Sequence, residues 1–284
     1  MAEKDSACVS ASSCSRESCE GCPSKSASGQ SFRVDQNASS NIRHVIGVVS
    51  GKGGVGKSLV TASLANALAK SGARVGILDA DITGPSIPKM YGLSGPAEVL
   101  GEKDIIPKIA ENGVKVMSLN LIMEDPEQAV IWRGPIIAGV VQQFWTDVVW
   151  GELDYLLVDM PPGTGDVPLT VFQSLPVEGI FIVTSPQDLV QMIVTKALNM
   201  ARMMNIPVLG VIENYSWLSC PGCGRKIEVF GKSGVEEVAK KTGIALAGRI
   251  PIEPSYSEKA DAGQFAQVDN EYIKGAMDCL RKGN

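Results

Sequence analysis

The chain has 284 residues, of which 44% are hydrophobic and 20% charged, and its formal net charge at pH 7 is −5. Such a composition suits a globular protein with a sizeable core, and the acidic balance argues against one that coats nucleic acid or anionic membrane. Because no stretch is apolar enough to cross a bilayer and the N-terminus lacks a secretory signal, we expect a cytoplasmic protein.

The first 41 residues differ in composition from the rest of the chain. They are rich in Ser, Cys and Ala and poor in large apolar residues, so we expect residues 1–41 to form a flexible, Cys-rich tail. In a reducing compartment, clustered cysteines favour metal ligation over disulfides. The tail holds four of the seven cysteines: Cys8, Cys14, Cys19 and Cys22.

Strands and helices are expected to alternate over residues 42–284. The β-branched run His44–Ser50 predicts a buried parallel strand, and the apolar spacing of Val60, Leu64, Ala67 and Leu68 predicts an amphipathic helix after it. The alternation predicts a doubly wound α/β fold with a mostly parallel sheet, whose ligands bind beyond the carboxyl ends of the strands. Further expected helices cover 137–148 and 190–201, and further strands are Ala73–Asp79, Val114–Leu119, Tyr155–Asp159, Ile180–Thr184, Val208–Glu213 and Ile244–Ile250.

A glycine-rich loop between the first strand and the first helix carries the strongest signal. It matches G-x-x-x-x-G-K-[ST], in which backbone N–H groups cradle phosphates at a helix N-terminus. Lys57 is expected to reach the β- and γ-phosphates of ATP, and the Ser58 hydroxyl to bind Mg²⁺. The sequence therefore predicts a fold of the P-loop NTPase type and an enzyme that hydrolyses ATP. The loop residues are Gly51, Lys52, Gly53, Gly54, Val55, Gly56, Lys57 and Ser58.

The second lysine of this loop, Lys52, carries additional information. The run K-G-G-V-G-K-S resembles the deviant Walker A motif of the MinD, ParA and nitrogenase-iron-protein class. That resemblance implies a homodimer in which Lys52 reaches the partner's nucleotide and offsets transition-state charge. The alternative is a solvated lysine at a strand end.

Three aspartates follow predicted strands. Asp159 ends the run Leu156-Leu157-Val158 and is expected to hold Mg²⁺, directly or through water. Asp81 is expected to position the attacking water, because the aspartate at this place in the resembled class lies in switch I. For Asp79 two roles stay open, a site carboxylate and a cap of the next helix.

The motifs together resemble the Mrp/ApbC branch of this class, whose members carry iron–sulfur clusters to apo-proteins. The resemblance implies that Asn214 contacts adenine, that the segment ending at Pro251 flanks the base, and that Cys220 and Cys223 bind the cluster. We interpret Trp132–Pro135 only as a turn that starts a helix. The motifs are Asp79–Pro88, Trp132–Pro135, Val158–Asp166, Glu213-Asn214-x-Ser216 and Cys220-Pro221-x-Cys223-Gly224.

The cysteine pair near residues 220–223 supplies two thiolates, and a four-coordinate site needs four. The resemblance implies a [4Fe–4S] cluster that bridges two subunits, whereas C-P-x-C-G is also the sequence of a zinc knuckle. For Cys8, Cys14, Cys19 and Cys22, a second iron–sulfur cluster and a zinc site both stay open. Cys279 is expected to be a small apolar residue of the last helix.

Three functions are weighed against one another. The leading one is an ATP-dependent scaffold and carrier that transfers a [4Fe–4S] cluster to apo iron–sulfur client proteins, without nucleic-acid or membrane partners. The alternative is a MinD/ParA-like positioning ATPase with a structural zinc knuckle. Against it, residues 270–284 have mixed charge and little apolar face for a membrane, and the net charge disfavours DNA. A redox enzyme like the nitrogenase iron protein is the third, and the CPxCG arrangement disfavours it.

Overall fold

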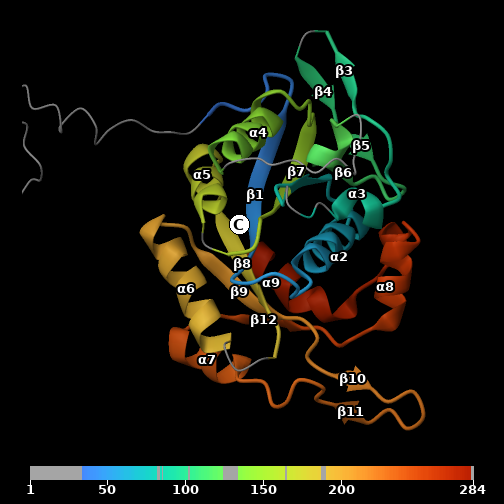
Figure 1. The fold of residues 1–284 in the computed structure, drawn as a ribbon, viewed down its shortest axis with the longest axis vertical. Helices are drawn as coiled ribbons and strands as arrows, with labels where there is room; N and C mark the ends of the chain where they lie inside the picture. The colour runs from blue at the N-terminus through green and yellow to red at the C-terminus, as the bar shows by residue number, and fades with distance from the viewer. Residues whose placement is uncertain are drawn as a thin grey trace, which may run out of the picture. The chain divides into compact units, whose positions relative to one another are not determined.

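A computed structural model of the chain describes residues 34–81, 84, 86–101, 103–123, 134–163, 165–186 and 190–282. They belong to one compact unit that begins at Val34, whereas residues 1–33, with the four tail cysteines, lie outside the described residues. Its centre is an eight-stranded sheet (Figure 1). The strands, in their order across the sheet, are β12 (Leu246–Arg249), β9 (Val208–Glu213), β8 (Gly179–Thr184), β1 (Asn41–Ser50), β7 (Glu152–Asp159), β2 (Val75–Asp79), β6 (Lys115–Ser118) and β5 (Lys108–Ile109).

The sheet confirms the expected doubly wound fold. All seven predicted strands are present and pair in parallel, while the short strand β5 runs antiparallel to β6 at one edge. Strand β1 lies near the middle, and Val45, Val48 and Val49 are at most 2% exposed because neighbouring strands flank β1 and helices cover both faces. The carboxyl ends of β1, β2 and β7 therefore meet at one edge of the sheet.

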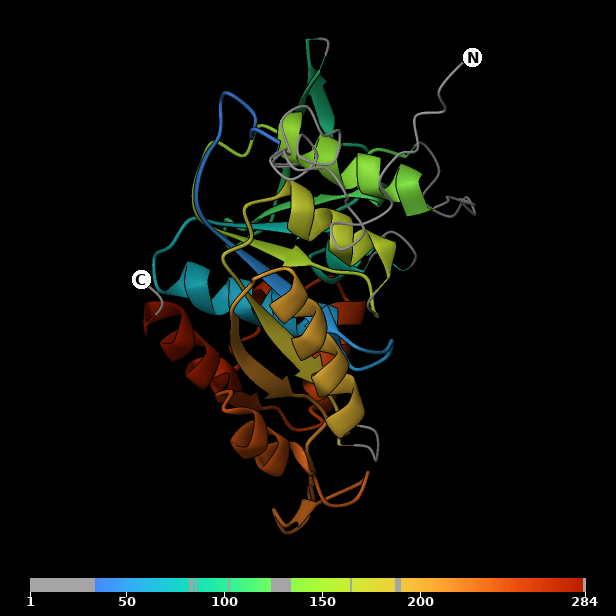
Figure 2. The ribbon, with the colours of Figure 1, turned by 90° about the vertical axis from the view of Figure 1, so that its left-hand side faces the viewer.

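Helices cover both faces of this sheet. Helices α2 and α9 contact it from one side, and α4, α5 and α6 lie on the other (Figure 2). Two short hairpins, β3 (Glu98–Leu100) with β4 (Asp104–Ile106) and β10 (Leu218–Ser219) with β11 (Lys226–Ile227), stand outside the main sheet. The helices are α2 (Lys57–Lys70), α3 (Ile87–Met90), α4 (Gly134–Thr146), α5 (Asp166–Ser174), α6 (Val190–Met203), α7 (Val235–Thr242), α8 (Pro254–Asp261) and α9 (Lys274–Lys282).

Helix α2 is buried on more than its predicted apolar stripe. Besides Leu64, the small polar residues Ser63 and Asn66 are buried, because the C-terminal segment lies across them. Asn270 Nδ2 donates to Ser63 Oγ at 3.1 Å, and Asn66 Nδ2 donates to the Phe265 carbonyl at 2.7 Å. The C-terminal segment thus holds the helix that follows the phosphate loop.

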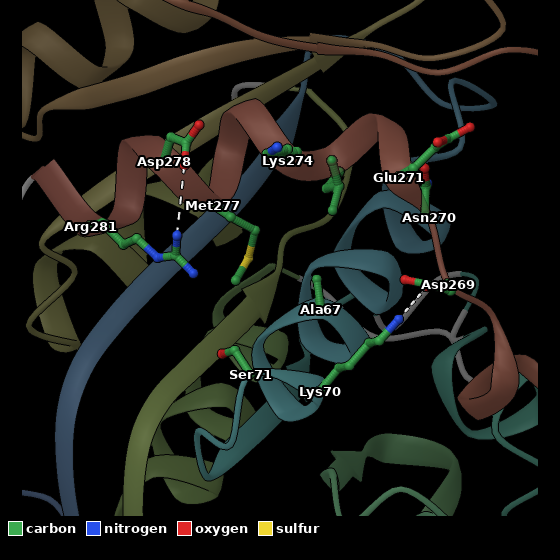
Figure 3. A pocket seen from close by; sticks show the side chains of 11 residues that line it. Ala67, Lys70, Ser71, Asp269, Asn270, Glu271, Lys274, Met277, Asp278 and Arg281 are labelled. Atoms are coloured by element: carbon green, nitrogen blue, oxygen red, sulfur yellow. Dashed lines mark hydrogen bonds and ion pairs between the residues drawn. The ribbon is translucent and has the colours of Figure 1, made fainter.

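The C-terminal segment corrects one expectation. Residues 270–284 were expected to have little apolar face, yet Ala276, Met277 and Leu280 of α9 are buried against β9, β12 and α2. A groove of about 520 Å³ runs along this contact, and the Lys70–Asp269 ion pair lies at its rim (Figure 3). The apolar face therefore packs onto the protein's own core. Among the described helices, none has the length and apolar character to span a membrane.

Residues 34–40 are part of the folded unit. The Val34 N–H donates to the Ser174 carbonyl at 3.0 Å, and Trp145 Nε1 donates to the Val34 carbonyl at 2.8 Å. The described body thus starts before residue 42, where we placed the boundary. A flexible tail over the preceding residues stays a prediction.

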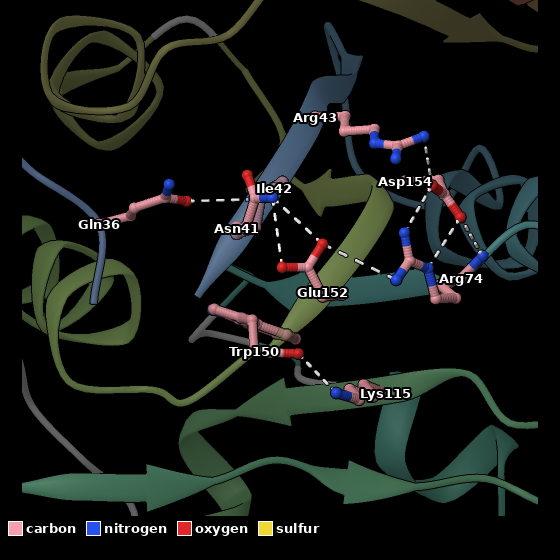
Figure 4. A network of polar contacts seen from close by, with 9 residues as sticks. All are labelled: Gln36, Asn41, Ile42, Arg43, Arg74, Lys115, Trp150, Glu152 and Asp154. Carbon is pink, nitrogen blue, oxygen red and sulfur yellow. Dashed lines mark hydrogen bonds and ion pairs between the residues drawn. The ribbon is translucent and has the colours of Figure 1, made fainter. Parts of the chain in front are cut away.

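A polar network lies at the amino ends of the strands, which is the edge of the sheet away from the phosphate loop (Figure 4). Arg74 Nη2 and Nε donate to the two carboxylate oxygens of Asp154 at 3.0 and 3.2 Å, and Arg43 lies 3.2 Å from the same carboxylate. These contacts, the Arg74 hydrogen bonds first, lower the pKa of Asp154 to about 2. The Asp154 carboxylate is therefore ionised in the folded protein well below pH 4.

Replacing Asp154 should cost stability only where the carboxylate is ionised. Because its folded pKa is depressed, its contribution is present above the unfolded pKa of about 4 and is lost as pH falls toward 2. After discounting for solvent screening we expect about 1 kcal/mol, so Asp154→Asn should lower the Tm by about 2–4 °C at pH 7 and by about half as much at pH 3. Calorimetry at the two pH values measures this. Asp278→Asn, which removes a more exposed carboxylate 3.9 Å from Arg281, is the control and should change little. An equal loss for Asp154→Asn at both pH values would contradict the assignment.

Candidate functional site

The glycine-rich loop lies between β1 and α2, as its motif predicts. Gly54 and Gly56 have φ values of 77° and 76°, a region that residues with a side chain rarely adopt. A Cβ at Gly56 would come within 2.2 Å of Asn214 Nδ2, and one at Gly51 within 2.3 Å of Ile193 Cγ2. Glycine is therefore required at these positions by backbone shape and by close packing.

A pocket of about 300 Å³ opens over this loop. Three buried side-chain atoms around the carboxyl end of the sheet make no hydrogen bond within the described structure: Ser50 Oγ, Lys57 Nζ and Thr184 Oγ1. Buried polar atoms are costly without partners, so their gathering here fits a site that a polar ligand completes. The residues around the pocket are Ser50, Gly53–Leu59, Asp81, Ser86, Met90, Pro162 and Tyr215.

The charged centre of the pocket is a buried ion pair. Lys57 Nζ lies 2.8 Å from Asp159 Oδ1 and 3.7 Å from Asp81 Oδ2, and Asp159 is fully buried. The ammonium is paired by charge but is not aligned for a hydrogen bond. The oxygens of a triphosphate would give the Lys57 ammonium well-aligned hydrogen-bond acceptors. The residues present therefore fit a nucleotide at this position.

Two hydroxyl groups of α2 also contact Asp159. Ser58 Oγ donates to Asp159 Oδ2 at 2.5 Å, and Thr61 Oγ1 lies 2.7 Å from Asp159 Oδ1. Ser58 and Asp159, the two expected Mg²⁺ ligands, are thus adjacent. Thr61 was not predicted, although it lies one helical turn after Lys57 and so on the same face of α2. The four-residue spacing between Lys57 and Thr61 is the sequence signal that could have predicted Thr61 as a site residue.

Asp79 and Asp81 face different surroundings. Asp81 lines the pocket, whereas Asp79 is fully buried beside Asp159, its partner in the β2–β7 register. Asp79 Oδ2 accepts from the Ile87 N–H at 3.4 Å, where α3 begins, which matches the capping role left open above. Burial and the neighbouring Asp159 raise the pKa of Asp79 well above its usual value. Asp79 is thus a buried acid behind the site.

The far wall of the site comes from the end of β9. Asn214 is buried, and its Nδ2 donates to the Val55 carbonyl of the phosphate loop at 3.0 Å. Tyr215 lines the pocket with φ at 59°, and burial raises the pKa of its phenol. Pro251, the predicted base-flanking residue, is buried just after β12. Sequence reasoning missed Tyr215, because no phosphate or base motif requires an aromatic residue there.

Several predicted residues lie apart from the pocket or cannot be placed. Lys52 is half-buried and is absent from the described lining of its own chain's pocket. Cys8, Cys14, Cys19 and Cys22 lie outside the described residues, as do Trp132 and Arg133. Gly134 begins α4, in keeping with the expected helix start. Cys279 of α9 is half-buried against the core.

Cys220 and Cys223 lie in the turn of the β10–β11 hairpin. The Cys220 N–H donates to the Arg225 carbonyl at 2.9 Å, and the Gly224 N–H to the Cys220 carbonyl at 2.8 Å. Cys220 is half-exposed and Cys223 exposed. Backbone N–H groups of Gly222 and Cys223 lower the pKa of the Cys220 thiol, which favours the thiolate that binds metal.

The hairpin offers only part of a metal site. No group of three or more His, Cys, Asp or Glu side chains able to hold a metal ion occurs among the described residues. Tetrahedral thiolate sites, of zinc or of an iron–sulfur cluster, use four ligands. A metal bound by the two thiols of this turn would therefore need further ligands from outside the described part of one chain.

Asp79→Asn should stabilise the folded protein increasingly as pH rises. Because the folded pKa of Asp79 is raised, wild-type stability falls between the unfolded pKa of about 4 and the folded pKa, by up to about 1.4 kcal/mol per pH unit, and the neutral amide avoids this cost. The Tm difference between variant and wild type should be larger at pH 8 than at pH 5. Asp261→Asn, at an exposed carboxylate, is the control for the charge change. A difference independent of pH would contradict the raised pKa.

Thr61→Val should weaken Mg²⁺-dependent nucleotide binding. The substitution keeps the side-chain shape but removes the hydroxyl beside Asp159, and a hydrogen bond to a charged group is worth about 1.5–3 kcal/mol. We expect about a tenfold rise in the Kd for ATP with Mg²⁺, measured by calorimetry. Thr242→Val is the matched control, since Thr61 Oγ1 and Thr242 Oγ1 each contact the carbonyl one helical turn back, at 3.1 Å from Lys57 and 2.7 Å from Val238. An unchanged Kd in Thr61→Val would show that the contact does not serve the site.

The sequence is similar to that of known carriers. The ParA family model described as NUBPL iron-transfer P-loop NTPase matches residues 41–281. An iron-sulfur cluster carrier protein of Methanocaldococcus jannaschii is 46% identical over 254 residues, which cover 86% of this chain and 87% of that protein. One of Clostridium perfringens is 48% identical over 231 residues, or 79% of this chain and 81% of that protein.

Solved structures agree with the sequence comparison. A nucleotide-binding protein of Archaeoglobus fulgidus in complex with ADP is 42% identical, with a TM-score of 0.74, and the match covers 82% of this chain and 91% of that chain. MinD in a MinC:MinD complex of Aquifex aeolicus shares the fold, with a TM-score of 0.59 at 22% identity. The matches span nearly all of the described body, and the chain belongs to the NUBPL-type iron-transfer family of P-loop NTPases, among the iron–sulfur cluster carrier proteins.

Proposed function

We propose that the protein is an ATP-hydrolysing scaffold that binds a [4Fe–4S] cluster and transfers it to apo iron–sulfur proteins. The observation that carries this proposal is the placement of two sites on one segment. Asn214, in the wall of the nucleotide site, and Cys220, in the metal-binding turn, are six residues apart. We expect the protein to act in the cytosol, where thiols stay reduced.

The nucleotide site supports ATP chemistry. Lys57 lies where it would neutralise the β- and γ-phosphates, and Ser58 and Asp159 would hold Mg²⁺, Asp159 directly or through water. Bound Mg²⁺ would supply charge neutralisation on the phosphates. Asp81 reaches the same pocket and would orient the attacking water. The ADP complex of the Archaeoglobus relative supports nucleotide binding by this chain.

A second copy of the chain would complete both sites. Two thiols per chain require two chains for a four-thiolate cluster, so we propose that Cys220 and Cys223 of two subunits hold one [4Fe–4S] cluster between them. Lys52 would then reach the nucleotide of the partner, as the deviant Walker A motif implies. Whether the four tail cysteines bind a further cluster or zinc stays a prediction.

Anaerobic reconstitution with ferrous iron and sulfide tests the carrier function. In a background with all four tail cysteines replaced by Ala, we expect about four iron and four sulfide per two chains, and transfer that activates an apo-acceptor enzyme. Adding Cys220→Ala and Cys223→Ala should abolish both cluster content and transfer. Cys279→Ala, which removes a thiol remote in sequence from the hairpin, is the matched control and should behave like its parent.

Two results would contradict the proposal. Undiminished transfer by the Cys220→Ala/Cys223→Ala variant would place the transferred cluster elsewhere. Zinc without sulfide, retained at Cys220 and Cys223 through reconstitution, would favour the positioning ATPase with a structural zinc knuckle.

A further inference from the structure

A short stiff segment joins the nucleotide pocket to the cysteine turn. It runs from Glu213, at the end of β9, to Cys220 and contains no glycine. Without glycine the backbone has less freedom to absorb a displacement locally. Movement at its first residues would therefore be passed to the hairpin that follows.

The pocket end of this segment is tied to the phosphate loop. Asn214 Nδ2 donates to the Val55 carbonyl at 3.0 Å, and the Tyr215 N–H donates to Asn214 Oδ1 at 3.0 Å. The phenol of Tyr215 packs on Gly56, where an added Cβ would lie 2.9 Å from the Tyr215 hydroxyl oxygen. Tyr215 thus stands in the pocket wall against a loop that cradles phosphates.

The backbone of Tyr215 is in an uncommon state. Its φ of 59° lies in the left-handed region, which is a genuine outlier for a bulky aromatic residue. Asn205, with φ at 54°, is the other described residue besides glycine with positive φ. Strained conformations are held by the surrounding contacts and concentrate at ligand sites and switches.

The hairpin end of the segment is equally well fixed. The Ser216 N–H donates to the Ile250 carbonyl at 2.9 Å, and the Trp217 carbonyl accepts from the Ile252 N–H at 2.7 Å. Lys226 Nζ, on the second strand of the hairpin, lies 4.0 Å from the centre of the Trp217 ring. Trp217, which precedes β10 in the chain, therefore contacts both Ile252 after β12 and Lys226 of β11.

We propose that Tyr215 contacts the bound nucleotide and transmits nucleotide occupancy to the Cys220–Cys223 turn. A ligand shifts a conformational equilibrium only through contacts that differ between the two states, and Tyr215 places such a contact at the root of the segment. This inference rests on the proposed function, because it supplies the residue that makes cluster handling depend on ATP. Tyr215 is then both a nucleotide-contacting residue and a positioning residue for the thiols.

The test is the alkylation rate of the two hairpin thiols with and without nucleotide. Full-length, reduced protein that is free of iron and zinc is treated with iodoacetamide in three samples. One contains no nucleotide, one contains Mg–ADP, and one contains a saturating non-hydrolysable Mg–ATP analogue. Mass spectrometry reads the tryptic peptide 203–225, which holds both Cys220 and Cys223. For the wild type we expect the analogue to change the rate about fivefold or more.

Tyr215→Gly should lower this nucleotide dependence to about twofold or less, because glycine adopts positive φ freely and removes the phenol. Asn205→Gly is the matched control, since it relieves the same backbone conformation at the end of α6, and it should keep the wild-type ratio. Should Tyr215→Gly bind no nucleotide, Tyr215→Asn takes its place, because asparagine also tolerates this φ.

Two outcomes would overturn the inference. One is a wild-type alkylation rate that nucleotide does not change, and the other is a Tyr215 variant that keeps the full wild-type ratio at saturating nucleotide. The assay contains no iron or sulfide. The alkylation assay therefore gives a result even if the protein binds no cluster. If the alkylation rates contradict the role of Tyr215, cluster binding and transfer are still tested separately by reconstitution.

Discussion

The site depends on one buried carboxylate. Asp159, at the end of β7, is fully buried and faces the Lys57 ammonium and the hydroxyls of Ser58 and Thr61, all from the first turn or so of α2. Breaking a buried ion pair by removing one partner typically costs about 3–5 kcal/mol, so this contact holds the phosphate loop against the sheet. The same groups are those that a triphosphate and Mg²⁺ would recruit. A nucleotide bound over the loop would therefore compete with Asp159 for the Lys57 ammonium and the Ser58 hydroxyl.

Parallel strands give this carboxylate its neighbours. The carboxyl ends of β1, β2 and β7 bring the loop, Asp79 and Asp159 together, and β9 adds Asn214 against Val55. The chain then leaves β9 and forms the cysteine hairpin almost at once. A fold that binds nucleotide at strand ends therefore places the thiols of Cys220 and Cys223 a few residues from the same site, and this proximity allows one site to influence the other.

The sequence predicts the central part of this arrangement well. Seven β-branched runs and the loop motif place β1, α2 and the aspartates correctly, because buried parallel strands and phosphate loops have strong local patterns. Other features depend on distant contacts. The buried polar face of α2 forms only because residues 265–270 lie across it. The apolar face of α9 can be read from the helical spacing of Ala276, Met277 and Leu280, but its packing on β12 cannot. Tyr215 packs on Gly56, 159 residues away, and no local pattern predicts that contact. The spacing from Lys57 places Thr61 on the right face of α2, but its contact with Asp159, 98 residues away, is visible only in the fold.

A crystal structure of the full chain with Mg²⁺ and a non-hydrolysable ATP analogue tests the central claim most directly. The account predicts that Lys57 Nζ leaves its position 2.8 Å from Asp159 Oδ1 to contact phosphate oxygens, and that the Ser58 hydroxyl turns from Asp159 to the metal. A nucleotide bound over the loop with both contacts to Asp159 unchanged would contradict it, because the buried pair would then be structural and not the acceptor of the phosphates.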